Sequence, residues 1–387
     1  MIPLKYNVRN LRVRWVNTLL TVIGTGAIVW SSCILFGLVE GLQHSLNVSG
    51  DPLDLIVMRK GSTSETNSGI ELTKAEKIPT LSGVMRDDKG RPLAALELLN
   101  IPIVERLDGS RANLIVRGVD PVSFELRPNF QIVKDGGRMF EPGKGECIVS
   151  KNLTKRFKGA ALGSELKVGE REKYRVVGVF SSGGSAAESE VWVDRKDLEQ
   201  NIAREGITSS VQVRAASQAD FESLRKTIEN DTQFKLAAIP EVQYFAEQSR
   251  SSIFLKVAGT VIAILLTIGA MFAAANTMYA AVSARTREIG TMRAIGFSRF
   301  DILISFLGES VLLCTLGGIL GLLATVPLSA LTYSTSVNFT EAAISFRFGP
   351  LVMTVALLMT LAMGVFGGLF PALRAVRLNV ITALREI

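Results

Sequence analysis

The residue types that most often carry out catalysis are scarce in this chain. His44 is the only histidine among 387 residues, which excludes a metal site built on several imidazoles. Cys33 and Cys314 lie in long apolar runs, so Cys147 has no partner for a disulfide or a cysteine-based metal site. The sequence Gly-x-x-x-x-Gly-Lys-Ser/Thr does not occur, so no P-loop for ATP is recognisable.

Carboxylates are more plentiful, but their surroundings favour structural roles. Glu188 and Glu190 lie in a charged, turn-rich part of the chain, where such pairs are usually solvated, and we assign them no acid-base chemistry. Glu309 lies in an apolar run, eight residues after Asp301, which is about 12 Å along a helix. That depth is nearer to the surface than to the middle of a ~30 Å apolar core. An ion pair with a nearby arginine is therefore favoured over a proton relay. We expect no catalytic, cofactor-binding or metal site in this chain, so the protein is not itself an enzyme.

A short charged segment, Ala281–Asp301, lies between two long apolar runs. Its charged residues are mostly basic: Arg285, Arg287, Glu288, Arg293, Arg299 and Asp301. Membrane proteins keep such basic segments on the cytoplasmic side. The segment therefore predicts a cytoplasmic loop that connects two transmembrane helices.

Apolar residues recur within this segment at intervals of three. Ile289, Met292 and Ile295 give a short helix an apolar stripe beside its charged residues. Gly296 would end that helix, and Ser298-x-x-Asp301 resembles a cap for the next one. We expect a compact helical elbow with a basic and an apolar side available to a partner. A stripe that simply rests on the membrane surface is the alternative.

Four apolar runs must position this elbow. Each is long enough for the ~20 residues that cross a bilayer. We expect transmembrane helices at 16–39, 251–280, 302–331 and 350–372. The first run is longer than the ~7–15 apolar residues of a signal peptide, and no small-x-small cleavage site follows it. We therefore expect a membrane anchor there.

The basic residues that flank these runs set the expected orientation. Those before the first run and after the last are Lys5, Arg9, Arg12, Arg14, Arg374, Arg377 and Arg385. With four spans, 1–15, 281–301 and 373–387 all lie on one side, which the positive-inside rule makes cytoplasmic. Residues 40–250 and a short loop at 332–349 then lie outside. A net charge of +7 arranged in this way suits anionic lipid headgroups and not nucleic acid.

Residues 40–250 are charged and rich in turn signals, which is typical of a folded domain. The expected strands are 53–58, 101–107, 111–119, 146–150, 165–168, 174–180, 191–193 and 211–213. Asp108-Gly109-Ser110 and Gly169-Glu170-Arg171 predict two hairpin turns among them. The expected helices are 152–157, 195–204 with Asp194 as its cap, and 218–229.

The order of these elements predicts a mixed α/β domain in two lobes. Strands and helices alternate in its second half, which indicates a crossover connection. We expect a β-rich lobe at about 105–190, inserted into an α/β lobe. The glycine- and serine-rich stretch 181–185 is either a mobile loop at their junction or a plain linker. From residue 241 a continuous helix should run into the second transmembrane span.

Two stretches of the sequence resemble a known family. Residues 276–296 read NTMYAAVSARTREIGTMRAIG, with Asp301-Ile302 and Glu309 after them, and residues 367–385 read GGLFPALRAVRLNVITALR. These motifs, and the order of one span, a large outer domain and three spans, resemble the FtsX-like ABC transporter permeases of the MacB/LolC type. In the outer domain the resemblance is one of architecture only. Asn379-Val380 depart from the pattern, since many relatives carry a proline before the final Ala-Leu-Arg.

The resemblance implies a permease of the bacterial inner membrane. It would work as a dimer, with a second copy or a paralogue, and with a separate ATPase that binds ATP and Mg. The helix Arg285–Gly296 would be the coupling helix on that ATPase, with contacts from Arg285, Arg287, Glu288, Ile289, Gly290, Met292, Arg293, Ile295 and Gly296. Glu288 and Arg293 would make polar contacts, and the apolar stripe would fill a groove. The transmembrane helices would transmit ATP-driven movement to a porter-like outer domain, a process called mechanotransmission.

Three functions stay open for such a permease. The first is export, in which the outer domain meets a periplasmic adaptor and an outer-membrane channel. The second is extraction of lipoproteins, as in LolC. The third is signalling to a cell-wall hydrolase, as in FtsX, for which an outer domain of about 210 residues is large. Export is the interpretation that we favour.

Overall fold

The computed structural model describes residues 15–127, 129–169, 172–248, 250–329, 332–337 and 340–377. The chain forms two compact units, each built from segments that are distant in sequence. The helical unit comprises Met1–Gly41, Ser252–Leu331 and Phe346–Ile387. The sheet unit comprises Leu42–Ser251 and Thr332–Ser345.

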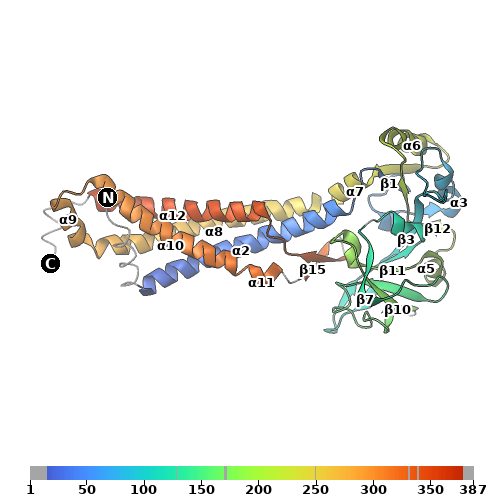
Figure 1. The fold of residues 1–387 in the computed structure, drawn as a ribbon, viewed down its shortest axis with the longest axis horizontal. Coiled ribbons are helices and arrows are strands. Elements are labelled where there is room, and N and C mark those ends of the chain that lie inside the picture. The colour runs from blue at the N-terminus through green and yellow to red at the C-terminus, as the bar shows by residue number, and fades with distance from the viewer. Residues whose placement is uncertain are drawn as a thin grey trace. The chain divides into compact units, whose positions relative to one another are not determined.

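Long apolar helices dominate the helical unit (Figure 1). They are α2 (Trp15–Val48), α8 (Arg250–Ser283), α10 (Arg299–Leu323) and α12 (Pro350–Arg377). Each is long and apolar enough to cross a membrane. This confirms the prediction of four transmembrane helices. Two short helices, α9 (Thr286–Ala294) and α11 (Val326–Ser329), flank α10 in the chain.

Glycines allow these helices to approach closely. A Cβ atom added to Gly26 of α2 would lie 2.9 Å from the carbonyl oxygen of Gly317 in α10, a distance that no real side chain adopts. Small residues at such points let two backbones meet, as the sequence predicts. Gly37 of α2 likewise packs against the ring of Phe348 in the same chain. Packing within the chain therefore accounts for this glycine.

One mixed sheet of ten strands organises the sheet unit. In spatial order its strands are β14 (Leu236–Pro240), β1 (Asp54–Arg59), β13 (Ser210–Arg214), β3 (Ala94–Asn100), β6 (Ile115–Val119), β11 (Glu190–Asp194), β8 (Glu146–Ser150), β10 (Glu172–Ser181) and β7 (Gln131–Gly137), with β9 (Glu165–Val168) paired to β10. Several of these strands, among them β1, β6, β10 and β11, are rich in β-branched residues, which suit a pleated, buried surface. The strands of both predicted lobes thus belong to one continuous sheet.

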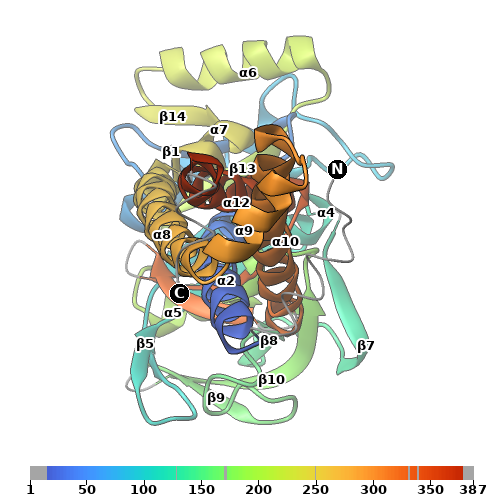
Figure 2. The ribbon, with the colours of Figure 1, turned by 90° about the vertical axis from the view of Figure 1, so that its left-hand side faces the viewer.

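Helices connect parallel strands of this sheet. The pairings β13–β1 and β1–β14 are both antiparallel, so β13 and β14 run parallel with β1 between them. Helix α6 (Gln218–Asn230) makes that crossover and lies beside β14 (Figure 2). Helix α5 (Arg195–Asn201) follows β11, and the Asp194 carboxylate accepts hydrogen bonds from two amides of its first turn. The predicted crossover topology and the predicted cap are confirmed.

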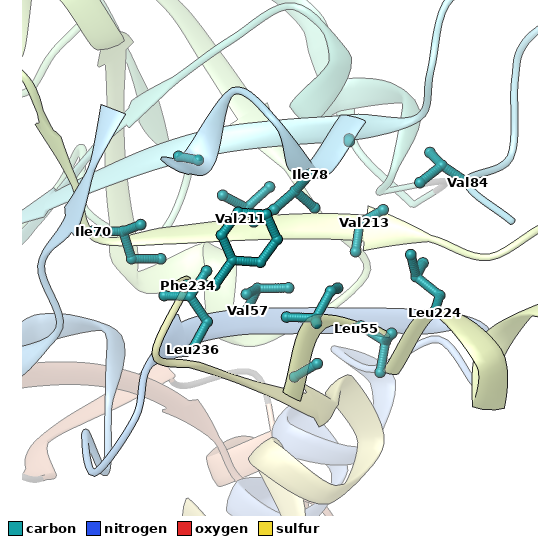
Figure 3. Packing of buried hydrophobic residues seen from close by; sticks show 14 of the residues in the cluster. Leu55, Val57, Ile70, Ile78, Val84, Val211, Val213, Leu224, Phe234 and Leu236 are labelled. Atoms are coloured by element: carbon teal, nitrogen blue, oxygen red, sulfur yellow. The ribbon is translucent and has the colours of Figure 1, made fainter. Parts of the chain in front are cut away.

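The two largest hydrophobic clusters among the described residues lie within the sheet unit. The first joins β1, β13, β14 and α6 through residues of 55–96 and 211–238, among them Val57, Val211, Leu224 and Phe234 (Figure 3). The second is built from residues of 98–198, with Phe157, Tyr174 and Val193 fully buried. The segment that supplies the second core is therefore nested in sequence within the segments that supply the first.

The predicted hairpins and the predicted helix at 152–157 agree with the structure to different extents. The second hairpin is confirmed, because β9 pairs antiparallel with β10. The first is confirmed only as a short pair, β4 (Ile103–Glu105) with β5 (Arg111–Asn113), because β6 leaves it to join the main sheet. The helix predicted at 152–157 is wrong, since these residues form turns and an isolated bridge.

Two predicted loops are more ordered than the sequence indicated. The stretch 332–349 contains strands β15 (Thr332–Val337) and β16 (Thr340–Ser345), which pair with each other. In the loop at 181–185, the Glu188 carboxylate accepts hydrogen bonds from the Ser181 hydroxyl and from the amides of Ser182 and Gly184. The continuous helix expected from residue 241 appears as α7 (Glu241–Gln248) and α8, and residue 249 lies outside the described residues.

Candidate functional site

The predicted elbow is a short helix, α9, between the ends of α8 and α10. Figure 2 looks along the helical unit and shows α9 across its near end. The helix ends in two hydrogen bonds, from the amide of Gly296 to the carbonyl of Arg293 and from the amide of Phe297 to the carbonyl of Met292. Together they form a Schellman motif. Its left-handed residue is Gly296, with φ +106°, which a residue with a Cβ atom adopts only under strain.

The chain turns directly from this motif into α10. Ser298 is the N-cap, and its hydroxyl accepts a hydrogen bond from the Asp301 amide. The Asp301 carboxylate in turn accepts from the Ser298 amide at 3.1 Å, which completes a capping box. The predicted helix end and the predicted cap are both confirmed. Only Phe297 separates the two devices, so the elbow has a defined geometry.

A buried ion pair ties the start of the elbow to α10. Arg285 donates from Nη1 to Oε2 of Glu309 at 2.9 Å and from Nη2 to Oε1 at 3.4 Å. Both side chains are buried, and the guanidinium lies 6.0 Å from the centroid of the Phe306 ring. The predicted pairing of Glu309 with an arginine of the loop is confirmed. Removing one partner of such a pair leaves an uncompensated buried charge, which costs about 3–5 kcal/mol.

Ile289 fixes the middle of the elbow to the rest of the helical unit. Its side chain is only 1% exposed and packs in a cluster with residues of α2, α8, α10 and α12. Gly290 beside it is buried as well. The expectation that Ile289 fills a groove on a partner is therefore wrong for this conformation, because its own chain already covers it. Arg285 is likewise occupied within the chain.

The opposite side of α9 is exposed. Its exposed residues recur at helical spacing, and we call them the outer face of α9: Arg287, Glu288, Thr291, Ala294 and Ile295. Ile295 is 73% exposed, and Phe300 at the start of α10 is 66% exposed. Met292 and Arg293 lie at intermediate depth. Of the predicted contact residues, the structure thus brings Arg287, Glu288 and Ile295 together on one accessible surface.

A second group of buried charges lies in the sheet unit, around Arg117 of β6. Its guanidinium makes five hydrogen bonds of 2.6 to 3.2 Å, to Glu65 of the 3-10 helix η1 (Glu65–Asn67), Glu97 of β3 and Glu190 of β11. All four side chains are buried. The description of Glu190 as a solvated surface carboxylate is therefore wrong. Its partners are distant in sequence, so no local pattern reveals them.

Arg127 extends this group toward a separate cluster that contains Phe180 and Trp192. It donates to both carboxylate oxygens of Glu97, at 2.7 and 2.9 Å, and lies 5.1 Å from the centroid of the Trp192 ring. Burial alone would raise the pKa of Glu97, but the charges of Arg127 and Arg117 outweigh it and lower the pKa to about 2. Glu97 is therefore ionised throughout the physiological range.

The chain segments that continue α2 and precede α8 are tied to the interior of the sheet unit. Glu241, the first residue of α7, accepts hydrogen bonds from the Asp51 amide at 2.9 Å and from Nε2 of Gln212 at 2.8 Å. The hydroxyl of Ser49, one residue beyond α2, accepts from the Ala186 amide at 2.8 Å. These bonds connect both segments to strands and loops of the sheet unit.

The described residues contain no group of three or more His, Cys, Asp or Glu side chains arranged to hold a metal ion. Cys33, Cys147 and Cys314 are all free and buried. Burial raises the pKa of the Cys147 thiol well above its usual range, so this thiol is unreactive.

Comparison with known families assigns both parts of the chain. The MacB-like periplasmic core domain matches residues 18–231, more than half of the chain. The FtsX-like permease C-terminal family matches residues 260–380, which contain the elbow and the three helices around it.

Relatives of known name agree with this assignment. The macrolide export ATP-binding/permease protein MacB of Bdellovibrio bacteriovorus is 24% identical over 404 residues, which cover 94% of this chain and 58% of that protein. MacB of Bradyrhizobium diazoefficiens is 31% identical over 256 residues, which cover 64% of this chain and 34% of that protein. The chain thus spans 58% of the length of the first relative and 34% of the length of the second.

Among solved structures, the periplasmic region of MacB from Actinobacillus actinomycetemcomitans is similar at a TM-score of 0.38 and 10% identity, covering 52% of this chain and 94% of that one. At this TM-score the likeness adds no weight to the assignment, which rests on the sequence matches. The chain belongs to the family of FtsX-like ABC transporter permeases with a MacB-like periplasmic core domain, and it is a multi-pass membrane protein.

Proposed function

We propose that this permease couples ATP hydrolysis by an ABC ATPase subunit to movement of its sheet unit, through the outer face of α9. The observation that carries the proposal is the contrast between the two sides of this helix. One side is anchored by Ile289 in a core shared by α2, α8, α10 and α12, and the other exposes Arg287, Glu288 and Ile295. A surface patch of mixed polar and apolar residues on a rigid support suits a protein partner.

The anchored side provides the route by which force would reach the membrane helices. A push on α9 acts on Ile289 and on the pair of Arg285 and Glu309, both of which connect it to neighbouring helices. Packed interiors transmit displacement because they resist compression. Along the chain, α8 leads back to α7 and Glu241, whose hydrogen bonds reach Asp51 and Gln212. Movement of α8 would thus be felt inside the sheet unit.

The orientation in the membrane follows from the placement of basic residues. We propose a location in the bacterial inner membrane, with α9 and both termini on the cytoplasmic side and the sheet unit outside. Arg287, Arg293 and Arg299 all lie at the α9 end of the helical unit, as do Arg374 and Arg377 in the last turn of α12. ATP and Mg would bind to the ATPase, and this chain would contribute contacts only.

Export is the function that we propose for the complete assembly. The relatives named above are macrolide export proteins, and their names include ATP binding. The complete assembly would contain two permease chains, a periplasmic adaptor and an outer-membrane channel. The substrate of this permease is a separate question, since substrates differ among permeases of one fold.

The proposal is tested by a charge placed on the outer face of α9. Ile289→Asp is unsuitable, because it would bury a carboxylate in the helical core and disturb folding. Ile295→Asp changes only an exposed side chain. We expect the full-length variant to reach the membrane. It should no longer co-purify with the ABC ATPase, which is recognised by a peptide that contains its P-loop, and it should no longer stimulate ATP hydrolysis by that ATPase.

The matched control is Ile103→Asp, which alters an exposed isoleucine of β4 that is 58% accessible. This variant should retain the ATPase and its stimulation. If Ile295→Asp behaves like Ile103→Asp in both assays, the outer face of α9 is not the coupling surface.

A further inference from the structure

A cavity of about 250 Å³ lies inside the sheet unit, beside the hydrogen bonds of Glu241. Its polar walls include Glu65, Arg117, Glu190, Gln212 and Glu241, each at least nine-tenths buried. Ile56 of β1 and Phe245 of α7 add an apolar side. The volume corresponds to roughly eight water molecules at ~30 Å³ each. The space is therefore large enough for a small organic molecule.

Two arginines, Arg117 and Arg127, line the cavity, and both are engaged by carboxylates. Arg117 has five N–H donors, and all five are used on the carboxylates of Glu65, Glu97 and Glu190. An anionic ligand would have to displace one of these carboxylates. A phosphate, sulfate or carboxylate group would therefore compete with Glu65, Glu97 or Glu190 at Arg117, and with Glu97 at Arg127.

Acceptors, in contrast, are in excess. Gln212 is 3% exposed and lines the cavity, and its Oε1 atom accepts no hydrogen bond from any described residue. A buried carbonyl without a donor is costly, which is why such atoms are rare in native proteins. The Nε2 atom of the same side chain is occupied by Glu241. Gln212 therefore offers an unused acceptor next to a carboxylate.

Glu241 adds a buried carboxyl group that has no salt-bridge partner among the described residues. It accepts hydrogen bonds from the Asp51 amide and from Gln212. Burial, reinforced by the charge of Asp54, raises the pKa of Glu241 to about 8. A positive charge beside this carboxyl would replace its proton. The neighbouring Asp54 is already paired with Arg214.

We propose that this cavity binds a small organic cation with an alkylammonium group. The ammonium would donate hydrogen bonds to Oε1 of Gln212 and to the carboxylate of Glu241, and the carbon chain would lie against Ile56 and Phe245. An ammonium carries three N–H donors and no acceptor, which is the complement of these walls. A metal ion fits less well, since the described residues form no cluster of ligands for one.

Calorimetry on the purified full-length chain tests this assignment with three probes of similar size. They are n-butylammonium, n-butanol and butyrate, which differ only in the charge and donors of the head group. We expect n-butylammonium to bind and butyrate not to bind, with n-butanol at least about tenfold weaker than the cation, the effect of one charged hydrogen bond. Equal binding of n-butylammonium and n-butanol, or no binding of the cation, would overturn the proposal.

Two variants test whether n-butylammonium binds in this cavity. Glu241→Gln keeps the shape of the side chain but removes its charge, and it should weaken n-butylammonium by at least about tenfold. Glu247→Gln makes the same change on the exposed side of α7 and should have no effect. Unchanged affinity in Glu241→Gln would contradict the proposal.

The wild-type protein provides a test that is independent of how the variants fold. Because Glu241 must lose its proton when the cation binds, the affinity should rise with pH by about tenfold per unit below 8 and level off above it. The charged groups that act on Glu241 are Asp54, Arg127 and Glu97, and Arg214 interacts with it as well, while Asp51 contributes the hydrogen bond of its amide. Asp54 has its own pKa raised to about 6 by burial, so the measurement is confined to pH 6.5–9. An affinity that is flat or falls over this range would overturn the proposal, whatever the outcome of the ATPase experiments.

Discussion

Arg285 in the helical unit and Arg117 in the sheet unit are both buried arginines, but they have very different surroundings. Arg285 pairs with one carboxylate, Glu309, and the two charges balance. Arg117 serves three carboxylates, of which Glu97 also pairs with Arg127, and Arg214 pairs with acidic residues nearby. The first arrangement is a closed clamp, whereas the second has more acidic groups than basic ones.

This difference indicates what each region is suited to do. A balanced pair in apolar surroundings holds two helices in a fixed relation and offers nothing to a ligand. A network with surplus acceptors retains the capacity to bind a cation, and Glu241 and Gln212 lie where that surplus meets a cavity. The same ion-pair chemistry thus supports force transmission in one unit and ligand binding in the other.

The largest effect should follow from removing Arg117. Arg117→Met leaves the buried carboxylates of Glu65 and Glu190 without their cation, and deprives Glu97 of one of two. Breaking one buried pair costs about 3–5 kcal/mol, and this change breaks three. We expect the sheet unit to unfold, which limited proteolysis of the full chain would detect. Lys89→Met, at an exposed position, is the control. A stable, protease-resistant Arg117→Met protein would show that the network is not required for the fold.

The stability lost on removing Arg285 in the helical unit should be easier to restore with a second substitution. Arg285→Met leaves one buried carboxylate and should lower stability by about 3–5 kcal/mol, together with the stimulation of ATP hydrolysis. The double variant Arg285→Met with Glu309→Leu removes both charges and should regain most of the stability. A thermal melt of the three proteins measures this.

The rescue sharpens the comparison between the two arginines. No single second substitution can repair Arg117→Met, because three carboxylates share that arginine. If the Arg285 double variant is no more stable than Arg285→Met alone, the pair is not the simple two-charge clamp described here.

The features that the sequence predicts correctly are those set by neighbours along the chain. The four apolar runs, the Gly296 helix end and the Ser298 cap all depend on residues a few positions apart. The pairing of Glu309 with an arginine was also predictable, since a carboxylate at that depth requires a cation and the adjacent loop is rich in arginine. Such local rules carry over directly from sequence to structure.

The features that were missed depend on contacts between distant segments. Ile289 and Ile295 look alike in the sequence, and only the packing of four helices decides that the first is buried and the second exposed. Glu190 bonds to a residue 73 positions away, and Glu65 to one 52 positions away. Without knowledge of the fold, these carboxylates cannot be distinguished from those of a solvated surface.

The most direct test of the central claim measures whether the ATPase covers the outer face of α9. Thr291→Cys places a thiol on that face, and Ser82→Cys places one on an exposed part of the sheet unit. The three native cysteines are buried, so a maleimide would report mainly on the added thiol. We predict that the ATPase protects Thr291→Cys from labelling in the assembled complex, and that Ser82→Cys labels equally with and without it. Labelling of Thr291→Cys that does not change when the ATPase is present would contradict the account.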